Sequence, residues 1–425
     1  MTAAPATRRL PRRRNVIDRR NWKVPVVFGV VAVALLLVYT LLPRDGESRF
    51  NLSTQADLIQ LPVLALPTAL AGWISVVLLA AVALFTGWLV YGRMRVPLWL
   101  TAAGAVVAVI GFLAWAASGG TLQVPGLLSG ALLLSVPIVY GALTGVIGER
   151  AGVVNIAIEA QLLFGAFTSA VVGSIAHNSY AGLIAAVLAG MLVGLVLALF
   201  AVKYFVEQVI VGVVVNVLVS GITGFLYLTW LSSDRAAFNS PPRFERIDIP
   251  LLSQIPVIGP TFFRQTIVVY ALYVIVALVA YALYRTRWGL RLRSVGEHPK
   301  AADTVGIDVA RTRFRNVVLS GGLAGAGGAF IVLGQAGIFD KDMTNGIGYI
   351  ALAAVIFGRW DPIRATLAAL LFGFASNLQN ALSILGSPVP SQFMLMLPYV
   401  VTLLAVAGLV GRSRAPAADG QPYIK

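Results

Sequence analysis

Long apolar runs separated by short polar stretches dominate this sequence. A helix needs about 20 apolar residues to cross the hydrocarbon core of a bilayer. Such runs predict about twelve membrane spans, at roughly 24–42, 67–90, 97–117, 127–147, 152–176, 181–202, 207–231, 266–284, 316–334, 347–359, 365–385 and 393–411. The run at 347–359 is short for a full crossing, which predicts a tilted, broken or re-entrant helix.

The type of secondary structure follows from what lipid permits. The residue alternation of a membrane barrel is absent from these runs, and an open sheet cannot satisfy its backbone polar groups in hydrocarbon. We therefore predict an all-α, polytopic helical membrane protein with about 10–12 transmembrane helices. The composition agrees, because 58% of the residues are hydrophobic and 12% are charged, which is about half the charged share of a soluble protein. An ordinary soluble enzyme is thereby excluded.

The rarer residue types limit the chemistry. The sequence has no Cys and two His. The lack of Cys excludes a disulfide framework, thiolate catalysis and Cys-ligated zinc, and the low His count argues against a His-ligated metal. We therefore expect no catalytic residues and no metal site.

The net charge of +15 raises the question of a nucleic-acid partner. Eight Lys or Arg precede the first span, and eight more lie in the loop at 285–315. Basic loops mark the cytoplasmic side, and an even number of predicted spans separates these two segments. Both segments and both termini are therefore predicted to be cytoplasmic. The N-terminal tail is expected to lie over anionic lipid rather than to bind nucleic acid.

The predicted organisation has four parts. Residues 1–23 form a basic, disordered cytoplasmic tail, and 24–126 hold an N-terminal transmembrane anchor with accessory spans. Residues 127–411 form the core, which includes the cytoplasmic loop 285–315. Residues 412–425 form a second cytoplasmic tail.

The loop at 285–315 carries the signals of a short helix. Pro299 suits the first helical position, with His298 before it as the cap residue. Gly306 is placed to end the helix in a left-handed conformation, and Asp308 can cap the next helix. A helix of two turns buries little by itself, so we expect it to dock on a partner.

Three segments carry a family resemblance. Gly296–Ile307 reads GEHPKAADTVGI and resembles the coupling-helix segment of ABC-importer permeases of the branched-chain amino acid, ribose and nucleoside group. Gly148–Phe167 reads GERAGVVNIAIEAQLLFGAF and is similar to a stretch typical of the simple-sugar and nucleoside branch, although Ala160 stands where that branch usually has Gly. The third segment is Gly346–Pro362.

The resemblance implies the ABC importer permease fold in a bacterial plasma membrane, for nucleosides or related simple sugars. It implies as partners a second permease in a heterodimer, a cytoplasmic ATP-binding subunit and an extracytoplasmic substrate-binding lipoprotein. ATP and Mg would bind the ATPase, leaving no cofactor in this chain, and no phosphate-loop motif occurs here. The residues that would contact the ATPase are Glu297, His298, Pro299, Lys300, Ala301, Ala302, Asp303 and Gly306.

Polar and aromatic side chains within the spans are candidates for a substrate pathway, because polar groups at membrane depth usually face the bundle interior. They are Asn155, Glu159, Gln161, Phe164, Asn216 and Asn377. Asn155 and Glu159 are four residues apart, which predicts a shared helical face. The alternative is that these groups hydrogen-bond neighbouring helices, with Asn155 and Glu159 supporting a cytoplasmic gate.

Other residues have plainer interpretations. Glu149 and Arg150 are read as a solvated pair at a helix end, or as a second contact with the ATPase. The glycine-rich stretch 321–328 predicts close helix packing. Trp360 and other tryptophans near span ends suggest an interfacial belt, and Asp342 is expected on the outer surface.

Two other functional classes are alternatives to an importer permease. An ion-coupled secondary transporter would favour carboxylates at mid-depth, whereas Glu159 and Glu207 are both predicted near the cytoplasmic side. A membrane enzyme lacks a cluster of reactive side chains. Dependence of uptake on ATP would separate these classes.

Overall fold

The computed structural model describes residues 22–385, 396 and 414–424. The predicted span at 393–411, apart from Met396, lies outside the described residues, as do residues 1–21 of the predicted N-terminal tail. Within the described ranges, ten helices are long and apolar enough to cross a membrane. The prediction of an all-α, polytopic membrane protein is confirmed.

The long helices match the first nine predicted spans and the eleventh. They are α1 (Lys23–Leu41), α2 (Thr68–Tyr91), α3 (Leu98–Ala116), α4 (Val124–Arg150), α5 (Ile158–Ile175), α6 (Ser179–Ala198), α7 (Gln208–Leu226), α9 (Ile267–Arg285), α12 (Val309–Ala329) and α14 (Pro362–Ile384). Three of them continue into wider π-helical turns, namely η1 (Leu199–Lys203) after α6, η2 (Tyr227–Leu231) after α7 and η5 (Phe330–Ala336) after α12.

Short elements connect these helices. The short helices are α8 (Arg235–Phe238), α10 (Arg287–Glu297), α11 (Pro299–Thr304), α13 (Ile347–Phe357), η3 (Leu252–Gln254) and η4 (Gly259–Phe263). The strands are β1 (Glu47–Asn51), β2 (Leu64–Pro67), β3 (Thr121–Gln123), β4 (Arg246–Asp248) and β5 (Arg264–Thr266). β4 and β5 pair antiparallel, with Ile247 opposite Gln265.

The chain forms two compact units. Among the described residues, unit 1 comprises 22–49 and 65–120, in which α1 packs on α2 and α2 on α3. The hydroxyl of Tyr39 on α1 donates a hydrogen bond to the carbonyl of Gly111 on α3, at 2.7 Å. Unit 2 comprises residues 50–64 and the described residues from 121 onward, and it holds the three motif segments described above.

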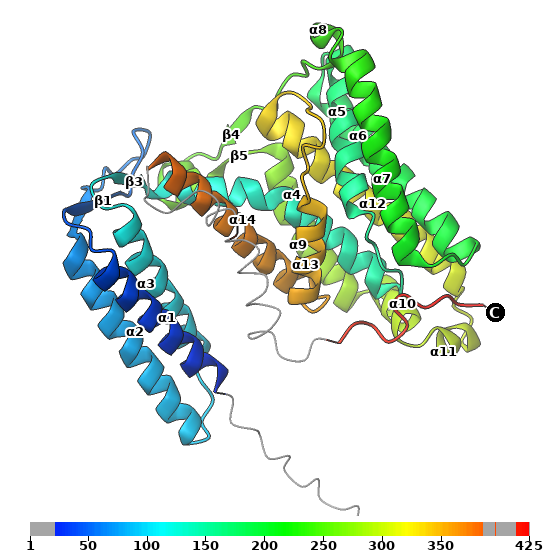
Figure 1. Cartoon of the computed structure of the whole chain (residues 1–425). Coiled ribbons are helices and arrows are strands. Elements are labelled where there is room, and N and C mark those ends of the chain that lie inside the picture. The colour runs from blue at the N-terminus through cyan, green and yellow to red at the C-terminus, as the bar shows by residue number, and fades with distance from the viewer. Residues whose placement is uncertain (1–21, 386–395, 397–413, 425) are drawn as a thin grey trace, which may run out of the picture. The chain divides into compact units, whose positions relative to one another are not determined.

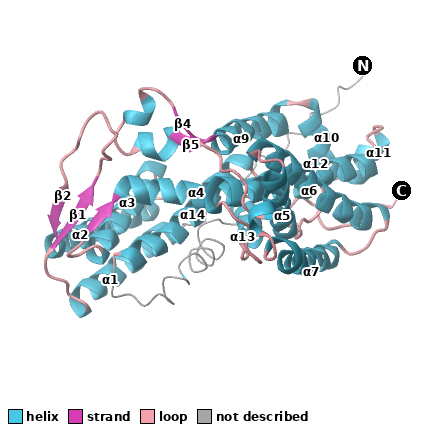
Figure 2. Ribbon diagram, turned by 90° about the horizontal axis from the view of Figure 1, so that it is seen from above, coloured by secondary structure: helices cyan, strands magenta, loops and turns pink. Residues whose placement is uncertain are grey.

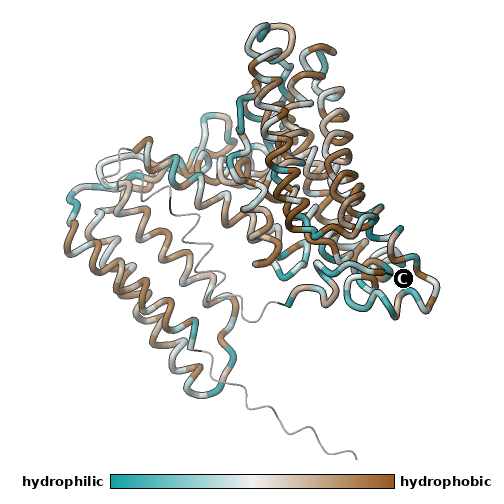
Figure 3. Tube along the Cα trace, turned by 45° about the vertical axis from the view of Figure 1, so that its right-hand side comes forward, coloured by the Kyte–Doolittle hydropathy of each residue, from teal (hydrophilic) through white to brown (hydrophobic). Residues whose placement is uncertain are grey.

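Helix α4 runs through unit 2, with α14 and α12 packed along it (Figures 1 and 2). Helix α12 also packs on α5 and α6. α10 and α11 lie at one end of this bundle and α8 at the other (Figure 1). Hydrophobic residues follow the lengths of the long helices, whereas hydrophilic residues gather at turns and helix ends (Figure 3). This distribution suits helices whose middles meet lipid or one another.

Helices α5, α6 and α12 meet backbone against backbone, as the glycine-rich stretch predicts. A Cβ added to Gly325 would lie 2.1 Å from the carbonyl oxygen of Ala186, and one added to Gly321 would lie 2.4 Å from that of Gly190. A Cβ on Gly165 would lie 2.5 Å from the Gly325 carbonyl oxygen. Only residues without a side chain permit this approach.

Replacing Gly325 with Val should therefore destabilise the protein by about 1–3 kcal/mol or more, because the obstructing atom is backbone and cannot turn aside. Thermal unfolding of the detergent-solubilised protein measures the change. Gly221→Val is the matched control, since no atom lies within 4 Å of a Cβ added there. Equal loss in the two variants would contradict the packing argument.

Candidate functional site

Helix α13 is too short to cross a bilayer. Its 11 residues span about 16 Å, roughly half of a hydrocarbon core of about 30 Å. The helix begins after Gly346, which has a left-handed φ of 84°, and residues 337–346 before it contain no helix. The prediction of a short helix at 347–359 is confirmed.

The carboxylate of Glu159, on the first turn of α5, holds the N-terminus of α13. Its Oε1 accepts hydrogen bonds from the Thr344 hydroxyl at 2.7 Å and the Gly346 N–H at 2.9 Å. Its Oε2 accepts one from the Gly348 N–H at 2.6 Å. The first N–H groups of a helix have no partner within it and carry partial positive charge, so a carboxylate satisfies both needs. Glu159 is thus the cap of a helix on a distant part of the chain.

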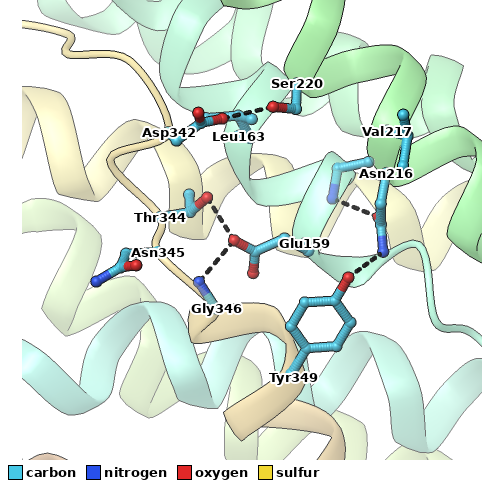
Figure 4. Close-up of a pocket in the computed structure, with 11 residues that line it drawn as sticks. Glu159, Leu163, Asn216, Val217, Ser220, Asp342, Thr344, Asn345, Gly346 and Tyr349 are labelled. Carbon is cyan, nitrogen blue, oxygen red and sulfur yellow. Dashed lines mark hydrogen bonds between the residues drawn. The ribbon is translucent and has the colours of Figure 1, made fainter.

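A pocket of about 340 Å³ lies beside this carboxylate (Figure 4). Its wall comes from α5, α7, the segment before α13 and the first turn of α13. The lining residues are Glu159, Ala160, Leu163, Asn216, Val217, Ser220, Asp342, Thr344, Asn345, Gly346 and Tyr349. Two carboxylates and no basic side chain line it, so the wall favours neutral or cationic solutes over anions.

Asn216 joins three elements at the pocket. Its side-chain oxygen accepts from the Ala160 N–H at 3.0 Å, which belongs to the first turn of α5. Its amide nitrogen donates to the Ile156 carbonyl at 3.0 Å and lies 3.1 Å from the Tyr349 hydroxyl. One turn further along α7, Ser220 donates to the Asp342 carboxylate at 2.5 Å (Figure 4). The pocket wall therefore carries several hydrogen-bonding groups, and Asn216 and Ser220 are paired with other groups of the wall in this conformation.

The other predicted pathway residues lie elsewhere. Asn155 and Gln161 are fully buried and bonded to each other, from Nδ2 to Oε1 at 3.2 Å. Phe164 is partly buried and stacks on Phe167. Asn377 on α14 donates to the Leu127 carbonyl at 2.7 Å. The structure brings only Glu159 and Asn216 together at the pocket.

The predicted shared helical face of Asn155 and Glu159 is wrong. Gly152 has a left-handed φ of 87°, and α5 begins only at Ile158. Asn155 therefore lies in the turn before the helix, where a spacing of four residues does not place side chains on one face.

The segment at 297–306 has the predicted local structure. α11 begins with Pro299 at its first turn after His298, Gly306 is left-handed with φ 83°, and the Asp308 side chain caps α12 through the Arg311 N–H. Of the eight predicted contact residues, Glu297, His298, Lys300, Ala301 and Gly306 are exposed, Pro299 and Asp303 are half-buried and Ala302 is buried. Most of this surface is thus open to a partner.

The interpretation of Glu149 and Arg150 as a solvated pair is wrong. Glu149 is 3% exposed and accepts a hydrogen bond from the indole N–H of Trp360. Arg150 donates to the Trp360 carbonyl at 3.0 Å and pairs with Glu297 at 3.8 Å. Trp360 is accordingly a buried anchor rather than part of an interfacial belt.

Sequence reasoning missed several pocket residues. Thr344 and Tyr349 were not singled out, and Asp342 was expected on the outer surface. The available signal was the short apolar run preceded by Gly346, because a helix that starts inside a bundle needs an acceptor for its first N–H groups. Among the described residues, no three His, Asp or Glu side chains come together as metal ligands would.

Comparison with known proteins places the core among transport proteins. The family model for the permease component of branched-chain amino acid transport systems matches residues 127–406. The guanosine ABC transporter permease protein NupQ of Bacillus subtilis (strain 168) is 40% identical over 69% of this chain and 95% of its own length. The nucleoside ABC transporter permease protein NupC of Lactococcus lactis subsp. cremoris (strain MG1363) is 38% identical over 72% and 98%.

A third relative carries a different description. The putative glucose ABC transporter permease protein TsgC13 of Haloferax volcanii is 34% identical over 66% of this chain and 85% of its own length. No solved structure matches the chain.

Proposed function

This chain belongs to the family of permease components of branched-chain amino acid transport systems, and from that membership we propose that it is the membrane-spanning subunit of an ABC importer for nucleosides. The observation that carries the substrate class is the similarity to two nucleoside permeases along nearly their whole lengths. The relative described as a putative glucose permease is less similar.

The pocket beside Glu159 supports this substrate class. A nucleoside is neutral and offers ribose hydroxyls and base edges to hydrogen-bond partners. Asn216, Ser220 and Asp342 supply such partners, and Tyr349, 48% exposed, offers an aromatic ring at the same wall. Asn155 and Gln161 lie behind the residues that line the pathway. Phe164 and Asn377 come to line the pathway in another conformation of the transport cycle. A phosphorylated substrate would meet repulsion from Glu159 and Asp342.

The energy source is a separate cytoplasmic ATPase, which binds ATP and Mg. Its movement acts on α11 and the neighbouring exposed residues. A second, different permease completes the pathway, and a lipoprotein on the opposite side delivers the substrate. This arrangement places the chain in a bacterial plasma membrane with both termini in the cytoplasm. The basic residues of the 285–315 loop support that orientation.

Uptake into vesicles tests the proposal. The chain is reconstituted with its second permease, its ATPase and its binding protein, and entry of radiolabelled guanosine is followed. We expect uptake only when ATP is supplied on the ATPase side, and competition by unlabelled adenosine but not by glucose.

Two results would count against this function. Guanosine entry driven by an ion gradient without ATP would favour a secondary transporter. Competition by glucose in place of nucleosides would move the substrate class to sugars.

A further inference from the structure

The C-terminal segment 414–424, here called the strap, is seated at the α10–α11 end of unit 2. The Ala418 N–H donates to the Gly296 carbonyl at 2.9 Å, and the Ala417 N–H donates to the Glu297 carboxylate at 3.3 Å. Gly296 itself touches the turn after α4, because a Cβ added there would lie 2.1 Å from the Arg150 carbonyl oxygen. The strap therefore meets α10 where α10 meets that turn.

A buried arginine on α12 depends on the strap. Arg313 is 3% exposed. Its Nη1 donates to the Gln421 carbonyl at 2.7 Å and its Nη2 to the Ala418 carbonyl at 3.3 Å. A buried guanidinium without such acceptors is costly. The strap thus supplies acceptors for both terminal nitrogens of this cation, whereas its buried Nε has no hydrogen-bond partner among the described residues.

Asp419 adds a second electrostatic contact. Its carboxyl is attracted to Arg313 and repelled by Glu149. Burial raises the pKa of Asp419 to about 7, although the Gly420 N–H and the Arg313 guanidinium oppose this shift. Asp419 is half-buried, and its Oδ1 is shielded from water.

Apolar packing extends the contact to three helices. Val295 on α10, Ala302 on α11 and Val309 on α12 form a buried cluster, and Tyr423 of the strap packs against it together with Ile307. Ala302 is the buried residue of α11. Because α11 buries so little, neighbours such as Tyr423 contribute substantially to its position.

The strap also reaches the turn between α4 and α5. A Cβ added to Gly420 would contact the Val154 side chain at 3.4 Å, and one added to Gly152 would lie 3.1 Å from the Ala418 carbonyl oxygen. Val154 stands five residues before Glu159, whose carboxylate caps α13. One short segment therefore touches both the predicted ATPase-facing helix and the turn that leads to the pocket.

We propose that the strap is a positioning element for coupling, which holds α10 and α11 against the α4–α5 turn so that their movement is passed to Glu159 and α13. The proposal rests on the ATPase-driven import proposed above. No residue of the strap touches substrate or nucleotide in this scheme. Its loss disconnects ATP hydrolysis from transport instead of stopping either reaction outright.

The test compares the full complex with a chain that ends at Arg414. We expect the amount of nucleoside transported per ATP hydrolysed to fall about tenfold, within the usual range of coupling between sites. The ATPase should still co-purify and hydrolyse ATP. A role in assembly alone would lower the yield of complex at an unchanged transport ratio, and that result would overturn the proposal.

Point variants keep the test decisive if the shortened chain fails to fold. Tyr423→Ala removes the ring from the cluster, whereas Ile424→Ala changes a neighbouring side chain that is 71% exposed. We expect less nucleoside transported per ATP hydrolysed for the first variant, and the wild-type amount for the second. Equal ratios in both would overturn the proposal.

A cross-linking experiment tests the contact between the strap and α10 independently of transport. The chain has no natural Cys, so Glu297→Cys with Ala417→Cys offers one thiol pair to a short bis-maleimide. We expect an intramolecular cross-link that neither single variant gives, and its absence would overturn the proposal. Failure of the proposed import function would appear differently, because the wild-type complex would then show no ATP-dependent uptake while the double-Cys variant still gave the cross-link.

Discussion

Deleting residues 299–305 should abolish ATP turnover coupled to nucleoside uptake while leaving the protein inserted in the membrane. The deletion removes α11, in which Ala302 is the buried residue, so little core is lost. It also removes the exposed surface around Lys300 and Ala301 on which the ATPase would act. Uptake and ATP hydrolysis measured in the same reconstituted vesicles should both lose their response to the loaded binding protein.

The level of chain in the membrane fraction is the control for this deletion. If the shortened chain does not insert, Lys300→Glu decides the point, since it alters only an exposed side chain. Transport at the wild-type rate in an inserted deletion variant would exclude α11 from coupling.

Replacing Glu159 with Gln should lower uptake about tenfold or more. The two side chains have the same shape, but an amide nitrogen cannot accept the hydrogen bond that Oε2 receives from Gly348. An unsatisfied buried donor costs about 1–3 kcal/mol, and here that cost falls on the conformation in which α13 is capped. Initial rates of radiolabelled guanosine uptake measure the effect.

The chain offers a matched control in Glu207. This exposed carboxylate caps α7 by accepting hydrogen bonds from the Val209 and Ile210 N–H groups at 3.1 and 2.8 Å. Water can replace those bonds, so Glu207→Gln should change uptake little. Equal effects at the two positions, or none at Glu159, would show that the α13 cap has no special role in transport.

The spans and the ends of α11 could be predicted because each depends on local chemistry. Lipid demands about 20 consecutive apolar residues whatever the rest of the chain does. Pro299, Gly306 and Asp308 likewise act on backbone within a few residues of themselves. Ten of the predicted spans and both ends of α11 therefore appear within the described residues.

The sequence did not predict helix α10, because its Arg residues interrupt the short apolar pattern of the helix. The stretch at 287–297 holds three Arg, and the sequence predicts it as part of a loop. In the structure Leu292 and Val295 are fully buried on one side of an 11-residue helix. Searching for spans of 20 apolar residues does not detect so short an amphipathic helix.

The pocket was only half predicted, since its partners are far apart in sequence. Glu159 and Asn216 stood out because polar groups are rare at membrane depth. Thr344 bonds to Glu159 across 185 positions, and Trp360 bonds to Glu149 across 211. Such pairings depend on how α13 packs in the bundle, which cannot be inferred from residues that are neighbours in the sequence.

The glycine contacts make α5, α6 and α12 a closely packed group within unit 2, whereas α13 is held at its N-terminus by hydrogen bonds to Glu159. Backbones that touch at Gly165, Gly190 and Gly325 have no intervening side chains to rearrange, so we expect these three helices to move together. Helix α13 is different, because left-handed residues flank it at Gly346 and at Arg359 with Trp360. A short helix with such residues at both ends, capped by the Glu159 carboxylate, can change position by exchanging a few hydrogen bonds. The closely packed helices α5, α6 and α12 need not repack for this change.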